Sequence, residues 1–154
     1  YIDFKNARND FDGEIERLVS KGFITKRQGE VLDRNKLLNL VNSPLTDRIV
    51  NSEKVYREFK FYTKILAKDA LENVPENFSE QKIILQGAVD LALVEDDSLV
   101  IVDYKTDRIK DVSELKELYS QQLLLYKNAM EQCTPYKVSK CIIYSITLGE
   151  FVEV

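Results

Sequence analysis

The segment ILQGAVDLALVEDDSLVIVDYKTDR, residues 84–108, decides the fold, because two apolar runs flank an acidic turn within it. The runs at 83–94 and 99–105 have the length and the content of β-branched residues that are typical of strands, and the loop between them predicts a hairpin. Each strand nevertheless carries an aspartate, Asp90 in the first and Asp103 in the second, and Lys105 follows two residues later. Three charges thus interrupt a segment that otherwise has the composition of protein core.

The register of this hairpin can be derived from its turn. If the turn centres on Asp96 and Asp97, Asp90 lies six residues before the first and Asp103 six residues after the second, so the two face each other. Only an odd-length loop or a bulge would shift that register. Directly opposed side chains have Cβ atoms roughly 4.5–5.5 Å apart. We expect the same face to carry Lys105 and the apolar residues Ala88, Ala92, Val94, Leu99 and Ile101.

Two facing carboxylates in partly dry surroundings predict a divalent metal site. They repel each other, and either one takes up a proton or a cation lies between them. Oxygen ligands of this kind suit Mg²⁺ or Mn²⁺, which keep several waters and share their coordination with substrate phosphates. Lys105 would then orient a water or stabilise developing charge. The alternative is a hairpin whose strand ends carry solvated charges, and the spacing alone does not decide between the two.

A helix predicted from about Ser113 to Gln132 adds polar groups to the same region. Its apolar stripe places Gln122 where an apolar residue would be expected, with Tyr126 one turn further on. A buried glutamine needs hydrogen-bond partners, which the hairpin acids would supply, or else it satisfies a backbone group. The stripe itself consists of Leu115, Leu118, Tyr119, Leu123, Tyr126, Ala129, Met130 and Cys133.

The rest of the chain predicts an α/β fold in which a mixed sheet is flanked by helices. Residues 1–50 have helical periodicity, with Ser43 and Pro44 as a helix start. The run VYREFKFYTKIL, residues 55–66, alternates like a strand, residues 69–82 form a polar connection, and the tail from Lys137 is rich in strand formers. Helices, three strands, one helix and further strand give an α/β sandwich with an N-terminal helical segment.

Composition limits the classes of function. The 154 residues suit one domain, and the net charge of −4 argues against a domain that only grips phosphate backbones. The absence of histidine excludes His-based triads, and two cysteines exclude a four-cysteine metal site; we expect both to be buried, reduced thiols. No apolar run has the length of a membrane span and there is no secretory signal, so a cytoplasmic location without membrane contact is expected. The chain begins at Tyr1, which indicates a piece of a larger protein.

At these residues the sequence resembles a known family. The motifs GAVD, IVDYKTDR and YSQQLLLY are similar to those of the RecB-type nuclease domains of the PD-(D/E)xK superfamily. More narrowly, they resemble the C-terminal nuclease domain of bacterial AddA helicase–nuclease proteins. The strand REFKF and the preceding helices resemble the same domain, so the likeness extends over most of the chain.

This resemblance implies roles for individual residues. Asp90, Asp103 and the main-chain carbonyl of Tyr104 would hold Mg²⁺ (or Mn²⁺), Lys105 would be the catalytic lysine, and Gln122 and Tyr126 would lie near the site and the DNA. Glu58 is a weaker candidate, because its face of the strand is not fixed by the register. The family has an upstream histidine ligand that this chain lacks, so we expect the isolated chain to be weakened or inactive as a nuclease.

The resemblance also implies a context. It predicts one nuclease domain over residues 1–154, with a helical segment 1–50 and a catalytic core 51–154, inside an ATP-dependent helicase–nuclease of recombinational DNA repair. A helicase motor would feed it a single DNA strand, and the rest of the AddA-like chain and an AddB-like protein would be its partners. The alternatives are an autonomous restriction-type or junction-resolving endonuclease, and a non-catalytic nuclease fold that serves as a scaffold.

Overall fold

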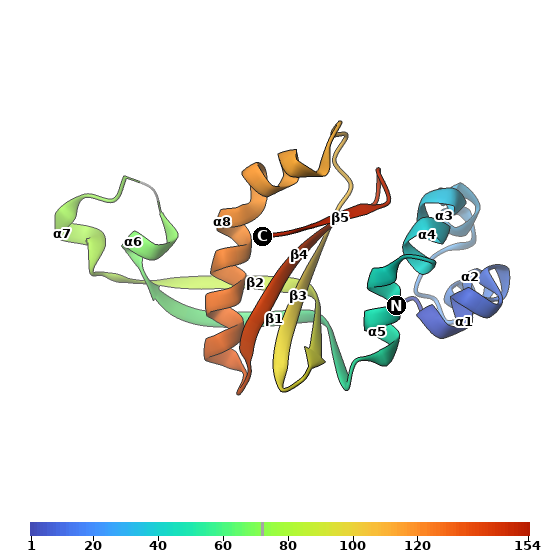
Figure 1. Cartoon of the computed structure of the whole chain (residues 1–154), viewed down its shortest axis with the longest axis horizontal. Coiled ribbons are helices and arrows are strands. Elements are labelled where there is room, and N and C mark those ends of the chain that lie inside the picture. The colour runs from blue at the N-terminus through green and yellow to red at the C-terminus, as the bar shows by residue number, and fades with distance from the viewer. Residues whose placement is uncertain (72) are drawn as a thin grey trace.

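The computed structural model describes residues 1–71 and 73–154, which form a mixed sheet between helices (Figure 1). Five helices precede the first strand: α1 (Phe4–Asn9), α2 (Phe11–Ser20), α3 (Lys26–Val31), α4 (Arg34–Val41) and α5 (Pro44–Asn51). The elements that follow are β1 (Lys54–Leu66), α6 (Ala67–Ala70), α7 (Glu76–Ser79), β2 (Lys82–Glu95), β3 (Ser98–Lys105), α8 (Val112–Cys133), β4 (Lys137–Ser145) and β5 (Glu150–Glu153). The order of element types agrees with the sequence prediction, apart from the two short helices inside the polar connection.

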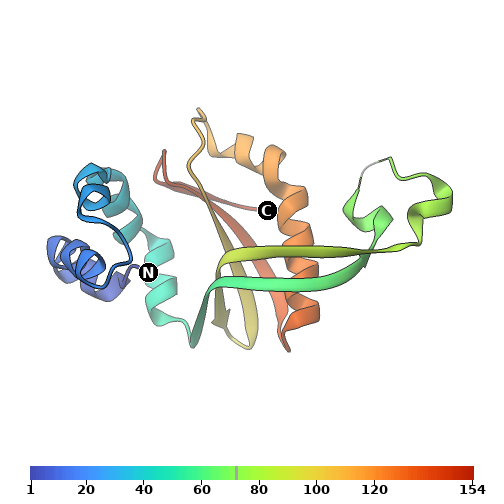
Figure 2. The ribbon, with the colours of Figure 1, turned by 180° about the vertical axis from the view of Figure 1, so that it is seen from behind.

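The sheet has the strand order β1-β2-β3-β4-β5, and only β3 and β4 are parallel. A parallel pair needs a long crossover, and α8 supplies it while it covers one face of the sheet. The N-terminal helices cover the other face, as the views from both sides show (Figure 2). The core under these helices contains Phe4, Leu40, Leu45 and Ile49 together with Leu91, Leu93, Val100, Val102, Ile142 and Tyr144. The predicted α/β sandwich is therefore confirmed.

The β2–β3 hairpin has the predicted register. Asp96 and Asp97 both have positive φ, 46° and 58°, as a tight primed turn requires. The ladder pairs Glu95 with Ser98 and continues to Leu91 with Val102. Ala92, Val94, Leu99 and Ile101 all join the core on the α8 side, as expected for one face.

Beyond the point where this ladder ends, β1 and β2 leave the sheet as a two-stranded arm (Figures 1 and 2). The arm comprises residues 59–66 and 82–89, and α6 and α7 lie at its tip. Glu58, at its base, has φ 49°, a left-handed conformation that is unusual inside a strand. The two faces of β1 exchange at this point. Before Glu58 the even-numbered Tyr56 contacts the α8-side core, and after it the odd-numbered Phe59 does.

That change of face overturns one expectation. Simple alternation predicts Ala88 on the face of Ala92, but Val89 is the residue that joins the α8-side core. Ala88 is paired with Lys60 on the arm, and strict alternation through Asp90 fails because the β1–β2 ladder is interrupted between Glu58 and Asp90. A kink of this kind has the same effect as a bulge, in that it exchanges the two faces of the strands beyond it.

The helices begin largely where the sequence predicted. Ser43 caps α5 with Pro44 at the first position, and Thr25 forms a capping box on α3. On α8, Leu115, Leu123, Ala129 and Met130 are buried.

Two members of the predicted α8 stripe are not in the core. Leu118 is 64% exposed because it lies at the margin of the stripe, and Cys133 is exposed because it is the last residue of the helix. Cys141 is buried as expected, and both thiols are free. No described helix combines the length and the apolar character that a membrane span requires.

Candidate active site

The two aspartates of the hairpin lie at the point where β2 separates from β3. The β2–β3 ladder ends at the pair of Leu91 and Val102, so Asp90 and Asp103 are the first residues beyond its paired part. Oδ2 of Asp90 accepts a hydrogen bond of 2.9 Å from the backbone N–H of Tyr104. A carboxylate thus takes the N–H next to the end of the ladder. Asp90 therefore lies where the pairing of β2 with β3 stops.

A third acid extends this row onto the neighbouring strand. The β1–β2 ladder pairs Arg57 with Leu91 and Phe59 with Val89, so the unpaired position between them places Glu58 opposite Asp90. Glu58 and Asp90 line a hollow of about 350 Å³ between the sheet and the first residues of the chain, with Arg57 and Tyr104 also on its wall. The face of Glu58, which the sequence left open, is thus on the side of this hollow.

Lys105 lies at the centre of the polar contacts on the α8 side. Its Nζ is 2.8 Å from Oδ2 of Asp103 and donates a hydrogen bond of 2.9 Å to Oε1 of Gln122. Nε2 of Gln122 in turn donates to the hydroxyl of Tyr126 at 3.1 Å. The Lys105 side chain is only 15% exposed, so a flexible ammonium is held in one orientation by an acid and an amide. The candidate residues of β3 and α8 therefore form one connected network.

Two further residues complete the setting of Lys105. Its Nζ lies 4.0 Å from the centroid of the Tyr119 ring, which is within the range of a cation–π contact. The Tyr119 hydroxyl donates to Oδ1 of Asp107 at 3.0 Å. Sequence reasoning placed Tyr119 in the core and gave Asp107 no role. The available signal was the position of Tyr119 three residues before Gln122, on the same side of the helix.

Burial dominates the electrostatics of Asp103. The residue is 4% exposed, and desolvation raises the pKa of its carboxyl above the ordinary range. The Lys105 ammonium lowers this pKa, while the negative charges of Asp90 and Asp107 raise it further. Oδ2 of Asp103 is buried, and its partner is the ammonium of Lys105, whose Nζ lies 2.8 Å away. Burial thus outweighs the effect of Lys105 on this pKa, and a further nearby cation would favour the charged form.

The tyrosines of the site stay protonated. Burial, followed by the charges of Asp103 and Asp90, raises the pKa of Tyr126. Burial also raises the pKa of Tyr104, whose hydroxyl has no hydrogen-bond partner among the described residues. Tyr126 is therefore a neutral donor and acceptor, and Tyr104 contributes to the site through its main chain.

The oxygen donors of the site are of the kind that divalent metal ions bind. Within residues 1–71 and 73–154, no three His, Cys, Asp or Glu side chains are close enough together to enclose an ion. Mg²⁺ in phosphate chemistry is commonly held by one or two carboxylates, with waters and substrate oxygens at the other positions. Asp90, Asp103 and the Tyr104 carbonyl would supply ligands of that kind, and the buried Asp103 carboxylate has a single ammonium beside it.

Known proteins resemble this chain over nearly its whole length. The chain matches the PD-(D/E)XK nuclease superfamily over residues 6–150. It is 32% identical over 155 residues to a protein of Clostridium acetobutylicum and 36% identical over 156 residues to one of Ruminiclostridium cellulolyticum, both of which are named as ATP-dependent helicase/nuclease subunits. These alignments include 99% of this chain but only 12% of each relative, so the chain spans about an eighth of their length. The chain belongs to the PD-(D/E)XK nuclease superfamily, as the motifs around Asp90, Asp103 and Lys105 predicted.

Proposed function

We propose that the chain is the metal-dependent DNA exonuclease domain of an ATP-dependent helicase–nuclease that acts in the recombinational repair of double-strand breaks. The observation that carries this proposal is the network of Asp103, Lys105, Gln122 and Tyr126 beside Asp90. A scaffold that had lost its chemistry would have no need to keep a buried acid and an immobilised ammonium together. Relatives that cover the whole chain are named helicase/nuclease subunits.

Each residue has a role in this proposal. Asp90, Asp103 and the Tyr104 carbonyl would hold Mg²⁺ or Mn²⁺, and the bound ion would supply charge neutralisation at the scissile phosphate and an acidified water. Lys105 donates hydrogen bonds to the attacking water or to a phosphoryl oxygen. Gln122 positions Lys105 through its amide oxygen, and Tyr126 fixes the orientation of that amide.

The wider context follows the relatives. We propose that residues 1–154 form one nuclease domain, with a helical segment 1–50 and a catalytic core 51–154, inside a longer AddA-like chain. A helicase motor in that chain would feed a single DNA strand to the site, and an AddB-like partner would process the other strand. The domain's negative charge is compatible with that arrangement, since most of the grip on DNA can come from the motor.

The test is hydrolysis of end-labelled single-stranded DNA with Mg²⁺, Mn²⁺ or EDTA, in the 154-residue chain and in a longer chain that includes its upstream residues. We expect cleavage with Mg²⁺ or Mn²⁺ and none with EDTA. The cleavage rate should fall roughly 100-fold or more in Asp103→Asn and in Lys105→Met. Asp96→Asn and Lys110→Met are matched controls, because each makes the same change of charge at an exposed position.

Calorimetric titration with Mn²⁺ separates the enzyme from the scaffold. The wild-type protein should release binding heat that Asp103→Asn lacks. Equal heats in both proteins, or cleavage that survives both substitutions, would refute the assignment. An autonomous endonuclease would instead cut closed circular DNA, which has no ends for an exonuclease.

A further inference from the structure

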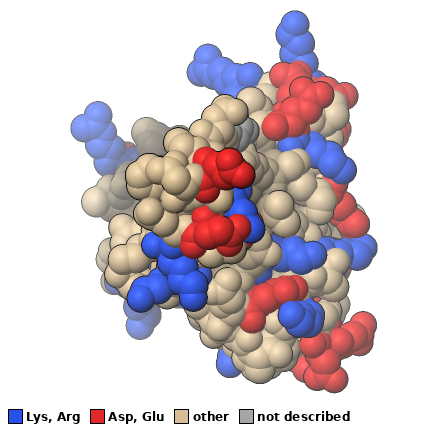
Figure 3. All heavy atoms as spheres, turned by 90° about the vertical axis from the view of Figure 1, so that its left-hand side faces the viewer, with Lys and Arg blue, Asp and Glu red and all other residues tan. Residues whose placement is uncertain are grey.

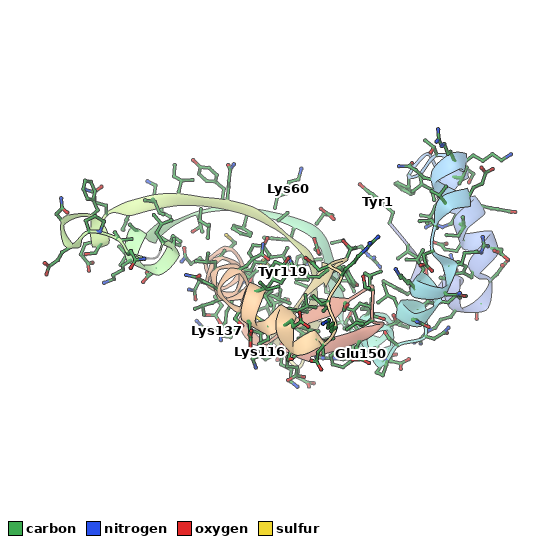
Figure 4. The ribbon with its side chains drawn as sticks, turned by 90° about the horizontal axis from the view of Figure 1, so that it is seen from above. Tyr1, Lys60, Lys116, Tyr119, Lys137 and Glu150 are labelled. Atoms are coloured by element: carbon green, nitrogen blue, oxygen red, sulfur yellow. The ribbon has the colours of Figure 1, made fainter. Side chains whose placement is uncertain are left out.

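The outer face of the β1–β2 arm has an uneven composition. On β1, Phe61 joins the α8-side core and Ile65, of the same parity, is also buried, so residues of the other parity point away from the body. These are Lys60, Tyr62 and Lys64 on β1, which the register places opposite Ala88, Gln86 and Ile84 on β2. Figure 4 shows the Lys60 side chain projecting from the arm on the side opposite α8. We refer to these six residues as the outer strip.

The outer strip carries positive charge without a carboxylate. Neither Lys60 nor Lys64 forms an ion pair with a described residue, whereas Lys68, at the tip of the arm, is paired with Glu80. In Figure 3, which views the molecule from the side of the arm's tip, several basic side chains project along the left-hand edge. In a chain with a net charge of −4, such a strip is an exception to the overall balance.

Two large side chains of the outer strip are exposed without a structural reason. Tyr62 is 64% exposed and Ile84 is 56% exposed. The opposite face of the arm supplies the packing, since Phe61 meets Tyr126 edge to face at 5.6 Å and the Thr63 hydroxyl bonds to Gln132. An isolated two-stranded ribbon is marginal in water, and its contacts with α8 make this one a fixed platform.

The outer strip leads to the acids of the site. Lys60 is two residues from Glu58, which is opposite Asp90. At about 3.3 Å per residue, Tyr62 is roughly 13 Å and Lys64 roughly 20 Å from Glu58 along the strand. An exposed aromatic between two lysines matches the chemistry of an unpaired nucleic acid, in which phosphates need cations and free bases stack on rings.

We propose that the outer strip binds an unpaired segment of the DNA substrate, with Lys60 and Lys64 on its phosphates and Tyr62 stacked on a base. This inference rests on the proposed nuclease function and adds to it a track outside the site. The outer strip would hold the DNA strand along the arm, next to Glu58 and Asp90. Stacking on Tyr62 requires that the base be unpaired. A double helix offers phosphates to the lysines but no free base to the tyrosine.

The test is the binding of fluorescein-labelled oligo(dT) to the 154-residue chain, measured by anisotropy in EDTA so that neither metal nor cleavage contributes. Lys60→Gln/Lys64→Gln should lower the affinity roughly 25-fold at an ionic strength of about 0.1 M and reduce the slope of log K against log salt by about 1.4. Lys60→Arg/Lys64→Arg should restore both. Lys21→Gln/Lys26→Gln removes the same charge from the N-terminal helices and should change neither.

Tyr62→Ala tests the stacking contact. It should weaken binding of the single strand about 5-fold or more and leave binding of a duplex of equal length unchanged, whereas Tyr62→Phe should behave like the wild-type protein. Circular dichroism of each variant verifies that the fold is intact. Equal losses in the arm and control variants, an unaffected affinity, or no binding by the wild-type protein would overturn the proposal.

The outcomes also separate this inference from the proposed function. If the chain binds DNA through the outer strip but does not cleave it with Mg²⁺ or Mn²⁺, the binding role of the strip is supported and the nuclease function is refuted. A chain that cleaves equally well with and without the two arm lysines keeps the nuclease and loses the track, and the strip would then be free to contact another protein.

Discussion

Gly87→Ala is a substitution whose effect can be worked out from distances at the base of the arm. Gly87 is paired with Phe61, and a Cβ added to it would lie 2.7 Å from Cζ and 3.1 Å from Cε1 of that ring. Phe61 is 5% exposed and rests edge to face on Tyr126, so its ring has little free space into which it can move. A methyl group at Gly87 therefore presses on a side chain that supports the contact between Gln122 and Tyr126.

The change in the free energy of unfolding is the cost of overpacking minus the stability gained when alanine restricts the unfolded chain. Overpacking of this kind costs about 1–3 kcal/mol, and Gly→Ala recovers about 0.4–1 kcal/mol by restricting the unfolded chain. The net loss is about 1–2 kcal/mol. With an unfolding entropy of about 2.1 cal/mol/K per residue, roughly 0.3 kcal/mol/K for the chain, Tm should fall by about 3–6 °C.

Thermal and denaturant unfolding of four proteins test this reasoning: wild type, Gly87→Ala, Phe61→Leu and the double variant. Because leucine removes the tip of the ring, the added methyl should cost almost nothing in the Phe61→Leu background. The reasoning fails if alanine costs the same in both backgrounds, or if Gly87→Ala leaves Tm unchanged. Gln86→Ala, the neighbouring substitution on the outer strip, should stay within about 0.5 kcal/mol of the wild-type protein.

Three further predictions concern the site and its support. Burial raises the pKa of Asp103, so the folded protein is more stable when this carboxyl is protonated. In EDTA, Tm of the wild-type protein should therefore fall relative to that of Asp103→Asn as pH rises from about 3.9 through the raised pKa. An identical pH dependence of Tm in the two proteins would contradict this. Metal-dependent cleavage should show the opposite trend and be lost as pH falls through the same window, which a pH–rate profile measures. Tyr119→Leu removes the ring beneath Lys105 and should lower kcat about 5-fold or more with little change in KM, whereas Tyr119→Phe, which keeps the ring, should retain kcat. Ser43→Ala removes the cap that accepts from Thr46 and should cost about 1 kcal/mol of stability in chemical denaturation, while Ser43→Asn should cost less.

The register of the site hairpin could be predicted because local chemistry determines it. Two aspartates that tolerate positive φ fix the turn, and the turn fixes the pairing of every residue up to Leu91 and Val102. The position of Gln122 within an apolar stripe likewise followed from helical periodicity. Its contact with Lys105 depends on how α8 packs on the sheet, and the structure supplies that packing.

The exchange of faces at the base of the arm could not be predicted. Glu58 is a glutamate in a left-handed conformation, and residue type favours glycine or asparagine for that backbone, so composition gives no warning. The alternating side chains from Val55 to Leu66 predict one regular strand. In the structure this strand bends near the point where Asp90 accepts a hydrogen bond from the N–H of Tyr104. The surroundings of Lys105 were missed for a related reason, since Asp107 lies in a loop whose path depends on the packing of α8.

The parallel pairing of β3 with β4 has a consequence for the order in which this protein folds. The β2–β3 hairpin is local and can close early, so Asp90 and Asp103 are brought to the same end of the hairpin while the chain is still largely open. Pairing of Asp103 with Ile143 requires the whole α8 crossover to dock first. A nascent chain would thus bring its like charges together before Lys105 reaches Gln122, and this transient repulsion should make chain collapse faster at acidic pH than at neutral pH.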